Sequence, residues 1–332
     1  MNMNELIDGF TDQLERAIEI GENVKLTKSN LAIHNVLITG LGGSGIGGTI
    51  VSELVRDKLK VPVVVNKSYF IPAFVNENTL VIVSSYSGNT EETLSALKEA
   101  FSKEAKIVCI TSGGEVMDFS RSNGLDYITV DGGMPPRACF GYSFVQLYYI
   151  LSGLGLINND FKKELKKAIQ LLDNESEEIH SIAKDVAAKI HDKMPIIYCD
   201  AEIEGVAVRF RQQINENSKM LCWHHVIPEM NHNELVGWRG NYAGHAVIFL
   251  RNEDDYERNQ MRMDFTKAVA KFCGADIIEI NSKGKSQIAK TLYLIHLTDW
   301  ISFYLSEHRN ADPIEIEVIS KLKNELSKTP MN

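Results

Sequence analysis

The chain has 332 residues, of which 44% are hydrophobic and 24% are charged, the composition of an ordinary globular protein with about two domains. This composition excludes intrinsic disorder, a collagen-like fibre and a small disulfide scaffold. The formal net charge is -9 and the lysines and arginines are scattered, so the basic patch typical of nucleic-acid binding is missing and we expect no nucleic-acid partner.

The N-terminal part of the chain predicts a helix over the first 20 residues or so. Residues 1–6 lack the basic segment and the apolar segment that mark a signal peptide. We therefore expect a cytoplasmic protein.

From Leu31 onward, short β-branched segments alternate with helical segments. Strands are predicted at 36–39, 61–65, 80–83, 107–110 and 127–130, and helices near 46–58, 90–102 and 115–123. This alternation is typical of a doubly wound parallel sheet with helices on both faces.

Residues 138–157 form a stretch of 20 residues without charge, roughly the length that crosses a bilayer. Its tyrosines, serines and glycines make it only moderately apolar, and no basic residues mark its C-terminal end. It predicts a buried or interface helix, so we expect no membrane partner.

The second half of the chain repeats the strand-then-helix order. After a polar helical segment at 161–193, strands are predicted at 195–199, 246–250 and 275–280, and helices near 205–215, 256–272, 285–307 and 313–328. We therefore expect an α/β protein with an N-terminal lobe (1–150), a helical connector (151–194) and a C-terminal lobe (195–332). Without a flexible linker, the site should lie in the crevice between the lobes, at the carboxyl ends of the strands.

A glycine-rich loop, Gly40-Leu41-Gly42-Gly43-Ser44-Gly45, follows the first predicted strand and opens a helix. It fits the G-x-G-x-x-G pattern of a dinucleotide site. Such a site also needs an acid at the end of the second strand to bind a ribose hydroxyl, and here that strand ends in Asn66-Lys67. We therefore expect no dinucleotide cofactor.

The third predicted strand ends in hydroxyl residues, Ser85, Ser87 and Thr90, just before a helix. Hydroxyls and free backbone N–H groups at the positive end of a helix dipole form a site for phosphate. The alternative is that Ser87 and Thr90 merely cap the helix. The neighbouring glycine loop favours a phosphate anchor, for which the candidate residues are Gly43, Ser44, Ser85, Ser87 and Thr90.

These two segments, 40–48 and 85–93, resemble the sugar isomerase (SIS) domain. Three further segments resemble one branch of that family, the bifunctional phosphoglucose/phosphomannose isomerases: Pro135-Pro136-Arg137, Asn215-Glu216-Asn217-Ser218-Lys219 and Asn231-His232-Asn233-Glu234. The resemblance runs from about residue 30 to the C-terminus. It implies two tandem SIS lobes and the conversion of glucose 6-phosphate, and of mannose 6-phosphate, into fructose 6-phosphate through a cis-enediol.

This reaction needs an acid/base near neutrality, a proton donor for ring opening and a cation for the enediolate. It needs no redox cofactor and no metal. The five cysteines are odd in number, widely spaced and without a C-x-x-C pair, so we expect mostly buried thiols and no zinc site.

Glu216 is the predicted base. The helix near 205–215 buries Val206, Phe210 and Ile214, and Glu216 lies off that stripe at its C-terminal end. Position alone would favour a solvated helix-end glutamate. The resemblance assigns the proton transfer between C1 and C2 to this position.

His232 is the predicted ring-opening group, because histidine titrates near neutral pH. His224 and His225 lie close by, and only the match to the family segment favours His232. In the family this histidine reaches the active site from the neighbouring subunit. The resemblance thus implies a homodimer with shared active sites.

Arg137 and Lys323 complete the predicted catalytic set. Arg137 follows two prolines at the start of the uncharged helix, and either pairs with Asp131 or, as the resemblance implies, stabilises the enediolate. The family also carries a lysine on the last helix, where Lys321 and Lys323 are available. Lys323 borders the apolar stripe of that helix and Lys321 points away, so we favour Lys323, although such a lysine can simply extend its ammonium to solvent.

Two other functions stay open. A regulator that binds sugar phosphates through an SIS domain without catalysis would normally carry a DNA-binding module, and this acidic chain shows none. The isomerase half of an aminotransfer enzyme would need an N-terminal cysteine, and the chain begins with Met1-Asn2. The sequence does not rank glucose against mannose phosphate.

Overall fold

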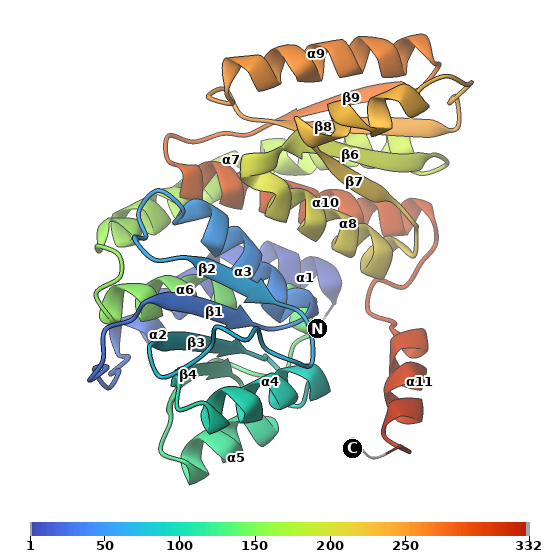
Figure 1. The fold of residues 1–332 in the computed structure, drawn as a ribbon. Coiled ribbons are helices and arrows are strands. Elements are labelled where there is room, and N and C mark those ends of the chain that lie inside the picture. The colour runs from blue at the N-terminus through green and yellow to red at the C-terminus, as the bar shows by residue number, and fades with distance from the viewer. Residues whose placement is uncertain (1, 330–332) are drawn as a thin grey trace.

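The computed structural model describes residues 2–329 and begins with two short helices, α1 (Met3–Asp8) and α2 (Phe10–Glu22). The N-terminal lobe then alternates strands and helices, as predicted. Its elements are β1 (Asn35–Thr39), α3 (Gly42–Leu54), β2 (Val63–Asn66), β3 (Thr79–Ser84), α4 (Glu91–Ser102), β4 (Lys106–Thr111), α5 (Gly114–Ser122) and β5 (Asp126–Thr129). The five strands are parallel in the order β2-β1-β3-β4-β5, which confirms a doubly wound sheet (Figure 1).

Both faces of this sheet are covered, because its strands carry apolar side chains at successive positions. One face packs against α4 and α5 through Leu37, Val81, Val83, Ile107 and Cys109. The opposite face belongs to the large central core through Val36, Ile38, Leu80, Ile82, Val108 and Ile110. The short 3-10 helix η1 (Pro136–Ala138) and then α6 (Phe140–Gly153) follow β5 and cover this inner face.

The long helix α7 (Asp160–Ile190) leads into the C-terminal lobe. The elements that follow are β6 (Met194–Asp200), η2 (Ala201–Ile203), α8 (Glu204–Ser218), β7 (Trp223–Ile227), η3 (Glu229–His232), η4 (Glu234–Gly237), β8 (His245–Arg251), α9 (Glu257–Phe272), β9 (Asp276–Asn281), α10 (Gln287–His308) and α11 (Glu317–Leu326). The second parallel sheet has the order β7-β6-β8-β9. β7 is not among the predicted strands, because it is an edge strand whose two histidines and partial exposure hide the apolar pattern of a strand.

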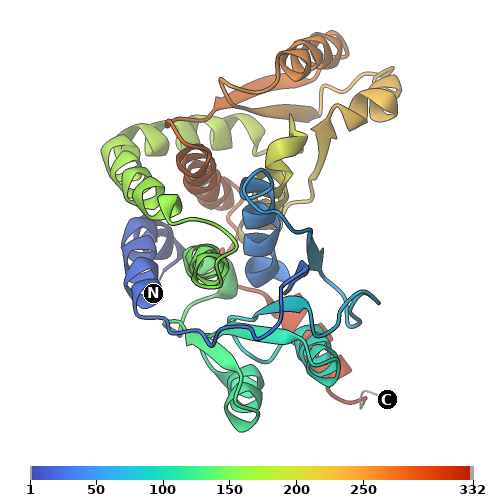
Figure 2. The same cartoon turned by 60° about the vertical axis from the view of Figure 1, so that its left-hand side comes forward.

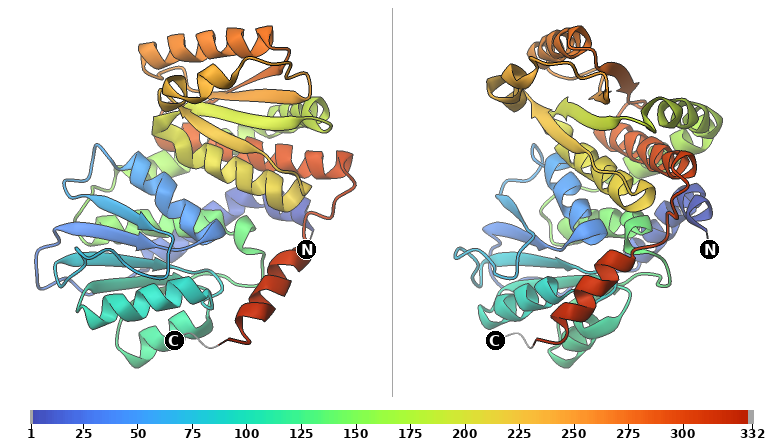
Figure 3. Two further views of the ribbon diagram at one scale, coloured as in Figure 1. Left: turned by 45° about the vertical axis from the view of Figure 1, so that its right-hand side comes forward. Right: turned by 90° about the vertical axis from the view of Figure 1, so that its right-hand side faces the viewer.

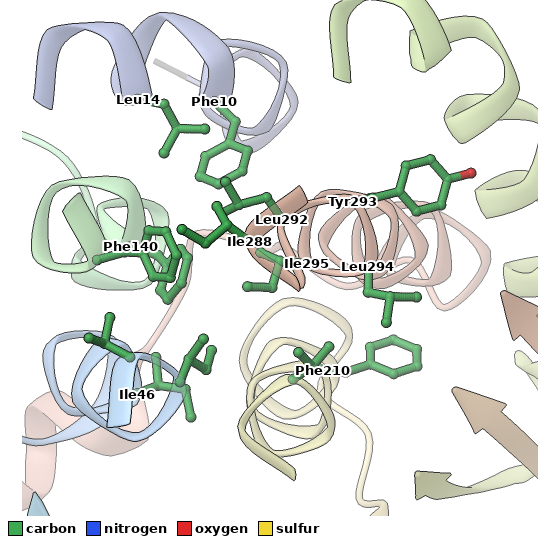
Figure 4. Close-up of a cluster of buried hydrophobic side chains, with 14 of the residues drawn as sticks. Phe10, Leu14, Ile46, Phe140, Phe210, Ile288, Leu292, Tyr293, Leu294 and Ile295 are labelled. Atoms are coloured by element: carbon green, nitrogen blue, oxygen red, sulfur yellow. The ribbon is translucent and has the colours of Figure 1, made fainter. Parts of the chain in front are cut away.

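The two sheets enclose a common layer of helices. Figure 2 shows α9 on the outer side of the second sheet and α4 and α5 on the outer side of the first. Between the sheets, α3 and α6 pack towards α8 and α10 in one continuous core. Figure 4 shows side chains of α2, α3, α6, α8 and α10 meeting in this layer, among them Phe10, Ile46, Phe140, Phe210 and Ile295. The two lobes therefore share one core.

The uncharged stretch of the sequence is a buried helix, as predicted: residues 140–151 of α6 are all buried. Within the described residues, no helix has both the length and the apolar character needed to cross a membrane. Three of the five cysteines are buried and the other two partly buried, all of them as free thiols.

The last helix differs from the others. α11 has no buried residue, and four apolar side chains on it, Val318, Ile319, Leu322 and Leu326, are exposed. Figure 3 shows α11 leaving the body of the molecule after α10 and running alongside the N-terminal lobe. In the single chain, the predicted apolar stripe of this helix is thus open to solvent.

The contact between the lobes contains a half-buried acid, Glu53 of α3, whose Oε1 accepts a hydrogen bond of 2.8 Å from the backbone N–H of Gly205 in α8. Burial raises the pKa of Glu53 to about 8, and the nearby Glu204 adds to this shift. The folded state therefore binds this proton more tightly than the unfolded state, and Glu53 makes folding less favourable as the pH rises from 4.5 to about 8.

We expect Glu53→Gln to remove this pH dependence. Glutamine keeps an oxygen that can accept from Gly205 and loses the charge that burial disfavours. The variant should unfold at the wild-type temperature at pH 4.5 and at a higher temperature above pH 8. Glu202→Gln, which changes an exposed acid nearby, is the control and should show no such divergence between the two pH values. Parallel curves for Glu53→Gln and wild type would contradict the assignment.

Candidate active site

The glycine loop packs directly against the turn that carries Arg137. A Cβ atom added at Gly43 would lie 2.6 Å from the carbonyl oxygen of Pro136 and 3.0 Å from Cα of Arg137. Only a glycine allows the first turn of α3 to approach η1 this closely. The loop therefore places the N-terminus of α3 beside Arg137.

The same loop is joined to the hydroxyl-rich segment after β3. The hydroxyl of Ser44 accepts a hydrogen bond of 3.0 Å from the backbone N–H of Tyr86, and the hydroxyl of Ser85 donates to that of Thr90 over 3.4 Å. Ser44 and Ser85 are buried, whereas Ser87 is exposed and Thr90 is half-buried. The structure thus brings the predicted phosphate-binding residues together at the carboxyl edge of the first sheet.

The hydrogen bonds of Thr90 and Ser87 test the alternative that these hydroxyls only cap α4. It occupies the N-cap position of α4, and its side chain makes no capping hydrogen bond. Ser87 accepts locally from the backbone N–H of Asn89 over 3.3 Å. The N-terminal N–H groups of α4 therefore stay available to an anion, as a phosphate anchor requires.

Arg137 lies almost completely buried, with 4% of its side chain exposed. Its Nε donates to Oδ1 of Asn217 over 2.8 Å, its Nη1 to Oε2 of Glu216 over 3.2 Å, and its Nη2 to the carbonyl of Pro313. Burial lowers the pKa of Arg137, and the carboxylate of Glu216 opposes that shift. Because a guanidinium carries five N–H groups, two stay free of these three acceptors.

The alternative partner of Arg137 is not used. Asp131 pairs instead with Arg16 of α2, with 2.9 Å between Oδ2 and Nε. A second cation, Arg209, lies at the same end of α6. Arg209 of α8 donates to the main-chain carbonyl of Arg137 over 3.1 Å.

Arg209 belongs to a buried ion pair that fixes the turn around Arg137. Its Nη2 lies 2.6 Å from Oδ2 of Asp299 in α10, and Gln213 donates to the other oxygen of Asp299 over 3.0 Å. Burial raises the pKa of Asp299, and Arg209 opposes that shift. Asp299 thus holds Arg209 in the core, and the hydrogen bond from Arg209 to the carbonyl of Arg137 anchors the turn that carries Arg137.

Glu216 stands at the C-terminal end of α8 with 30% of its side chain exposed. The helix buries Val206, Phe210 and Ile214, as predicted, and leaves Glu216 on the side of Arg137. The neighbouring Asn217 is fully buried, and its Nδ2 donates to the hydroxyl of Ser302 over 2.9 Å. Asn217 thus links Arg137 to Ser302 of α10. Its place in the 215–219 segment could have suggested a role in the site.

His232 lies exposed at the end of η3 on a well-anchored segment. Asn231 donates to the hydroxyl of Thr266 over 2.9 Å, and Glu234 accepts from Nε1 of Trp223 over 3.3 Å. Its neighbours therefore hold the segment in place while the histidine faces outwards.

Within one chain, His232 and Glu216 are far apart along the second sheet. Glu216 precedes β7 and His232 follows it, and the five residues of β7 span about 13 Å. The two side chains therefore lie at opposite ends of the strands, Glu216 at the amino end and His232 at the carboxyl end. The structure does not bring His232 to the Arg137–Glu216 pair of its own chain.

Lys323 is also not brought to this pair. It is exposed on α11 and makes no side-chain hydrogen bond or ion pair with any residue between 2 and 329. Lys321 pairs with Glu317 over 2.6 Å. The stripe that favoured Lys323 exists, but the helix that carries it does not pack on its own chain.

The predicted location of the site needs one correction. The first lobe contributes the carboxyl edge of its sheet, as expected. The second lobe contributes the C-terminal end of α8, which lies at the amino edge of its sheet. Glu216 points towards Arg137 because α8 packs on α3 in the shared core.

The arrangement combines hydroxyl and N–H groups that suit an anion, a buried guanidinium with free donors and a partly exposed carboxylate. Such a set can bind a phosphate ester, move a proton at a carbon beside a carbonyl and stabilise the resulting enediolate. Among the described residues, no group of three or more His, Cys, Asp or Glu side chains is arranged to hold a metal ion.

Comparisons with known proteins place these features in context. Residues 32–123 match the SIS domain, and residues 179–326 match the bacterial phospho-glucose isomerase C-terminal SIS domain. A bifunctional phosphoglucose/phosphomannose isomerase of Caldicellulosiruptor bescii is 40% identical over 98% of this chain and 99% of its own length. One of Aquifex aeolicus is 33% identical over 97% of this chain and 98% of its own.

A solved structure shows the same fold. The C-terminal domain of glucosamine-fructose-6-phosphate aminotransferase from Francisella tularensis matches with a TM-score of 0.76 and 14% identity, over 94% of this chain and 98% of that one. At this identity the likeness concerns the fold alone.

Proposed function

We propose, from the premise that this chain belongs to the bifunctional phosphoglucose/phosphomannose isomerase family, that it interconverts glucose 6-phosphate and mannose 6-phosphate with fructose 6-phosphate. The observation that carries the proposal is the Arg137–Glu216 pair, which lies beside the glycine loop. A regulator that only binds sugar phosphates would not need a carboxylate paired with a buried guanidinium. The reaction uses no cofactor.

The phosphate of the substrate binds at the carboxyl edge of the first sheet. Ser87 and Thr90 offer hydroxyls there, Ser44 and Ser85 hold the loop in shape, and the N-terminus of α4 supplies N–H groups. Because Gly43 touches the turn of Arg137, a sugar anchored by its phosphate extends towards Glu216. Binding energy from the phosphate then positions C1 and C2 for reaction.

Glu216 takes the proton from one carbon and returns it to the other. The negative charge that develops on the enediolate oxygens is stabilised by the free N–H groups of Arg137. Because the Arg137 side chain is almost completely buried, water screens its charge less, and the stabilisation of the enediolate is stronger. Asn217 and Arg209 keep the guanidinium in place during this step.

A planar enediol has no stereocentre at C2. Reprotonation at C2 from one side gives the glucose epimer and from the other side the mannose epimer. A single pocket that accepts both orientations therefore serves both hexose phosphates.

His232 protonates the ring oxygen in the site of a neighbouring subunit, and the working enzyme is a homodimer. Two observations support this. His232 is exposed on an anchored segment at the opposite edge of the sheet from its own Glu216. The exposed apolar stripe of α11, which includes Val318 and Leu322, is the kind of surface that a subunit contact covers.

The protein acts in the cytoplasm on hexose phosphates that glycolysis and gluconeogenesis share. Its cysteines are free thiols, as in a reducing compartment.

A coupled assay of the purified protein tests the function. With fructose 6-phosphate as substrate, glucose 6-phosphate and mannose 6-phosphate are measured separately, with and without EDTA. We expect both products and no effect of EDTA. Absence of both products would refute the isomerase, and loss of activity in EDTA with recovery on adding zinc would refute the metal-free mechanism.

We expect Ser87→Ala to raise KM strongly for the sugar phosphates, because an exposed hydroxyl of the phosphate anchor is lost. Inorganic phosphate should compete with the substrate in the wild type and less well in the variant. Ser102→Ala, at the other end of α4, is the matched control and should keep the wild-type KM. Equal turnover of free glucose and glucose 6-phosphate by the wild type would contradict the phosphate anchor.

A further inference from the structure

Lys219, the residue that ends α8, has an unusual backbone conformation. Its φ of 51° and ψ of 42° are left-handed, a conformation that glycine adopts at many helix ends and other residues avoid. Unfavourable backbone conformations of this kind often occur at functional sites. Lys219 lies two residues after Asn217 and three after Glu216, so the conformation occurs next to the proposed base.

The side chain of Lys219 turns back onto the end of its own helix. Its Nζ donates to the carbonyl of Glu216 over 2.6 Å and to the carbonyl of Glu315 over 2.7 Å. Arg309 donates from Nε to the carbonyl of Ser218, the last residue of the helix, over 3.1 Å. Two cations thus satisfy carbonyls in the last turn of α8, which would otherwise lack partners.

The second acceptor of Lys219 belongs to the connector between α10 and α11, residues 309–316. Arg137 donates to the carbonyl of Pro313 in the same connector. Burial lowers the pKa of Lys219, Glu315 opposes this shift and the positive charge of Arg137 adds to it, so the two cations lie close together. The connector therefore crosses the Arg137–Glu216 pair and is held at two points by its main-chain carbonyls.

We propose that Lys219 is a positioning residue of the isomerase site, which fixes the turn that carries Glu216 and holds the connector 309–316 over the Arg137–Glu216 pair. The catalytic part of this inference rests on the proposed function. The structural part does not, since it concerns contacts that can be measured without substrate.

The simplest alternative is that Lys219 only ends the helix. A glycine would do this better, because it adopts a left-handed conformation without strain. Lys219→Gly therefore separates the two roles, since it relieves the backbone and removes the ammonium. Glu104→Gly is the matched control, because Glu104 is an exposed residue with a φ of 57° that follows α4 at the amino edge of the first sheet.

We expect Lys219→Gly to stay folded and to lose activity. Its kcat should fall about 10- to 100-fold, because a small displacement of Glu216 suffices for such a loss, while KM should change little because the phosphate anchor is intact. Lys219→Arg keeps a cation that can reach the same carbonyls and should recover most of kcat. Glu104→Gly should keep the wild-type kcat.

Hydrogen–deuterium exchange measures the connector directly. In Lys219→Gly, amides of residues 309–326 should exchange faster than in the wild type, whereas Lys219→Arg and Glu104→Gly should leave them unchanged. Wild-type kcat in Lys219→Gly, or unchanged exchange in this segment, would overturn the proposal. If the wild type proves inactive, the proposed function fails, and the exchange experiment still decides whether Lys219 holds the connector.

Discussion

Glu216→Gln is expected to lower kcat by about 10²–10⁴-fold while the sugar phosphate still binds. Glutamine keeps the size of the side chain and an oxygen that can accept from Arg137, which now lies 3.2 Å from the carboxylate. It cannot take a proton from carbon. The loss should therefore appear in kcat and not in KM, because the phosphate anchor on the first lobe is untouched.

Isotope exchange tests this assignment independently of turnover. In deuterated water, the wild type should introduce deuterium at C1 or C2 of the sugar, and the variant should not. Glu204→Gln, in the first turn of the same helix and remote from Arg137, is the control and should exchange normally. Undiminished exchange by Glu216→Gln would place the base elsewhere.

Mixing two inactive variants is expected to restore activity. If each site takes Glu216 from one subunit and His232 from the other, Glu216→Gln and His232→Ala homodimers are both nearly inactive. A heterodimer has one site with both changes and one site with neither. Equal amounts that exchange at random give half heterodimers, each with half of its sites intact, so about one quarter of the wild-type activity should return.

The control uses homodimers that are cross-linked before mixing. They cannot exchange subunits and should stay inactive. Mass spectrometry of the mixture without cross-links shows whether heterodimers form. Heterodimers without a gain in activity would mean that both residues act within one chain.

Most of the fold could be predicted because the strands of the first sheet are short apolar segments with helices between them. Each strand from β1 to β5 was placed to within two residues of its observed bounds. β7 could not be predicted, because an edge strand with a partner on one side needs few apolar residues. Its first residues, Trp223-His224-His225, lack the apolar pattern that predicts a strand. The apolar stripe predicted on α11 is present, but an apolar pattern in the sequence does not identify the surface that the helix packs against.

The candidate site divides in the same way. Glycine and hydroxyl residues at strand ends act over a few residues, so their grouping near Ser44 and Ser87 follows from the order of the strands. The partners of Arg137 come from residues 79, 80 and 176 positions away in the chain, and no local pattern selects them. The sequence left Asp131 as an equally good partner, which in the structure pairs with Arg16.

By itself, the sequence determined the α/β order, the glycine- and hydroxyl-rich segments that are predicted to bind phosphate, and the motif around Glu216, because these depend on neighbouring residues and on periodicity. The tertiary structure alone decided that α8 delivers Glu216 to Arg137, that Asn217 and Lys219 hold this pair in place, and that His232 faces away from it. These facts depend on how the helices between the two sheets pack, and packing is a property of the whole core and not of any one segment.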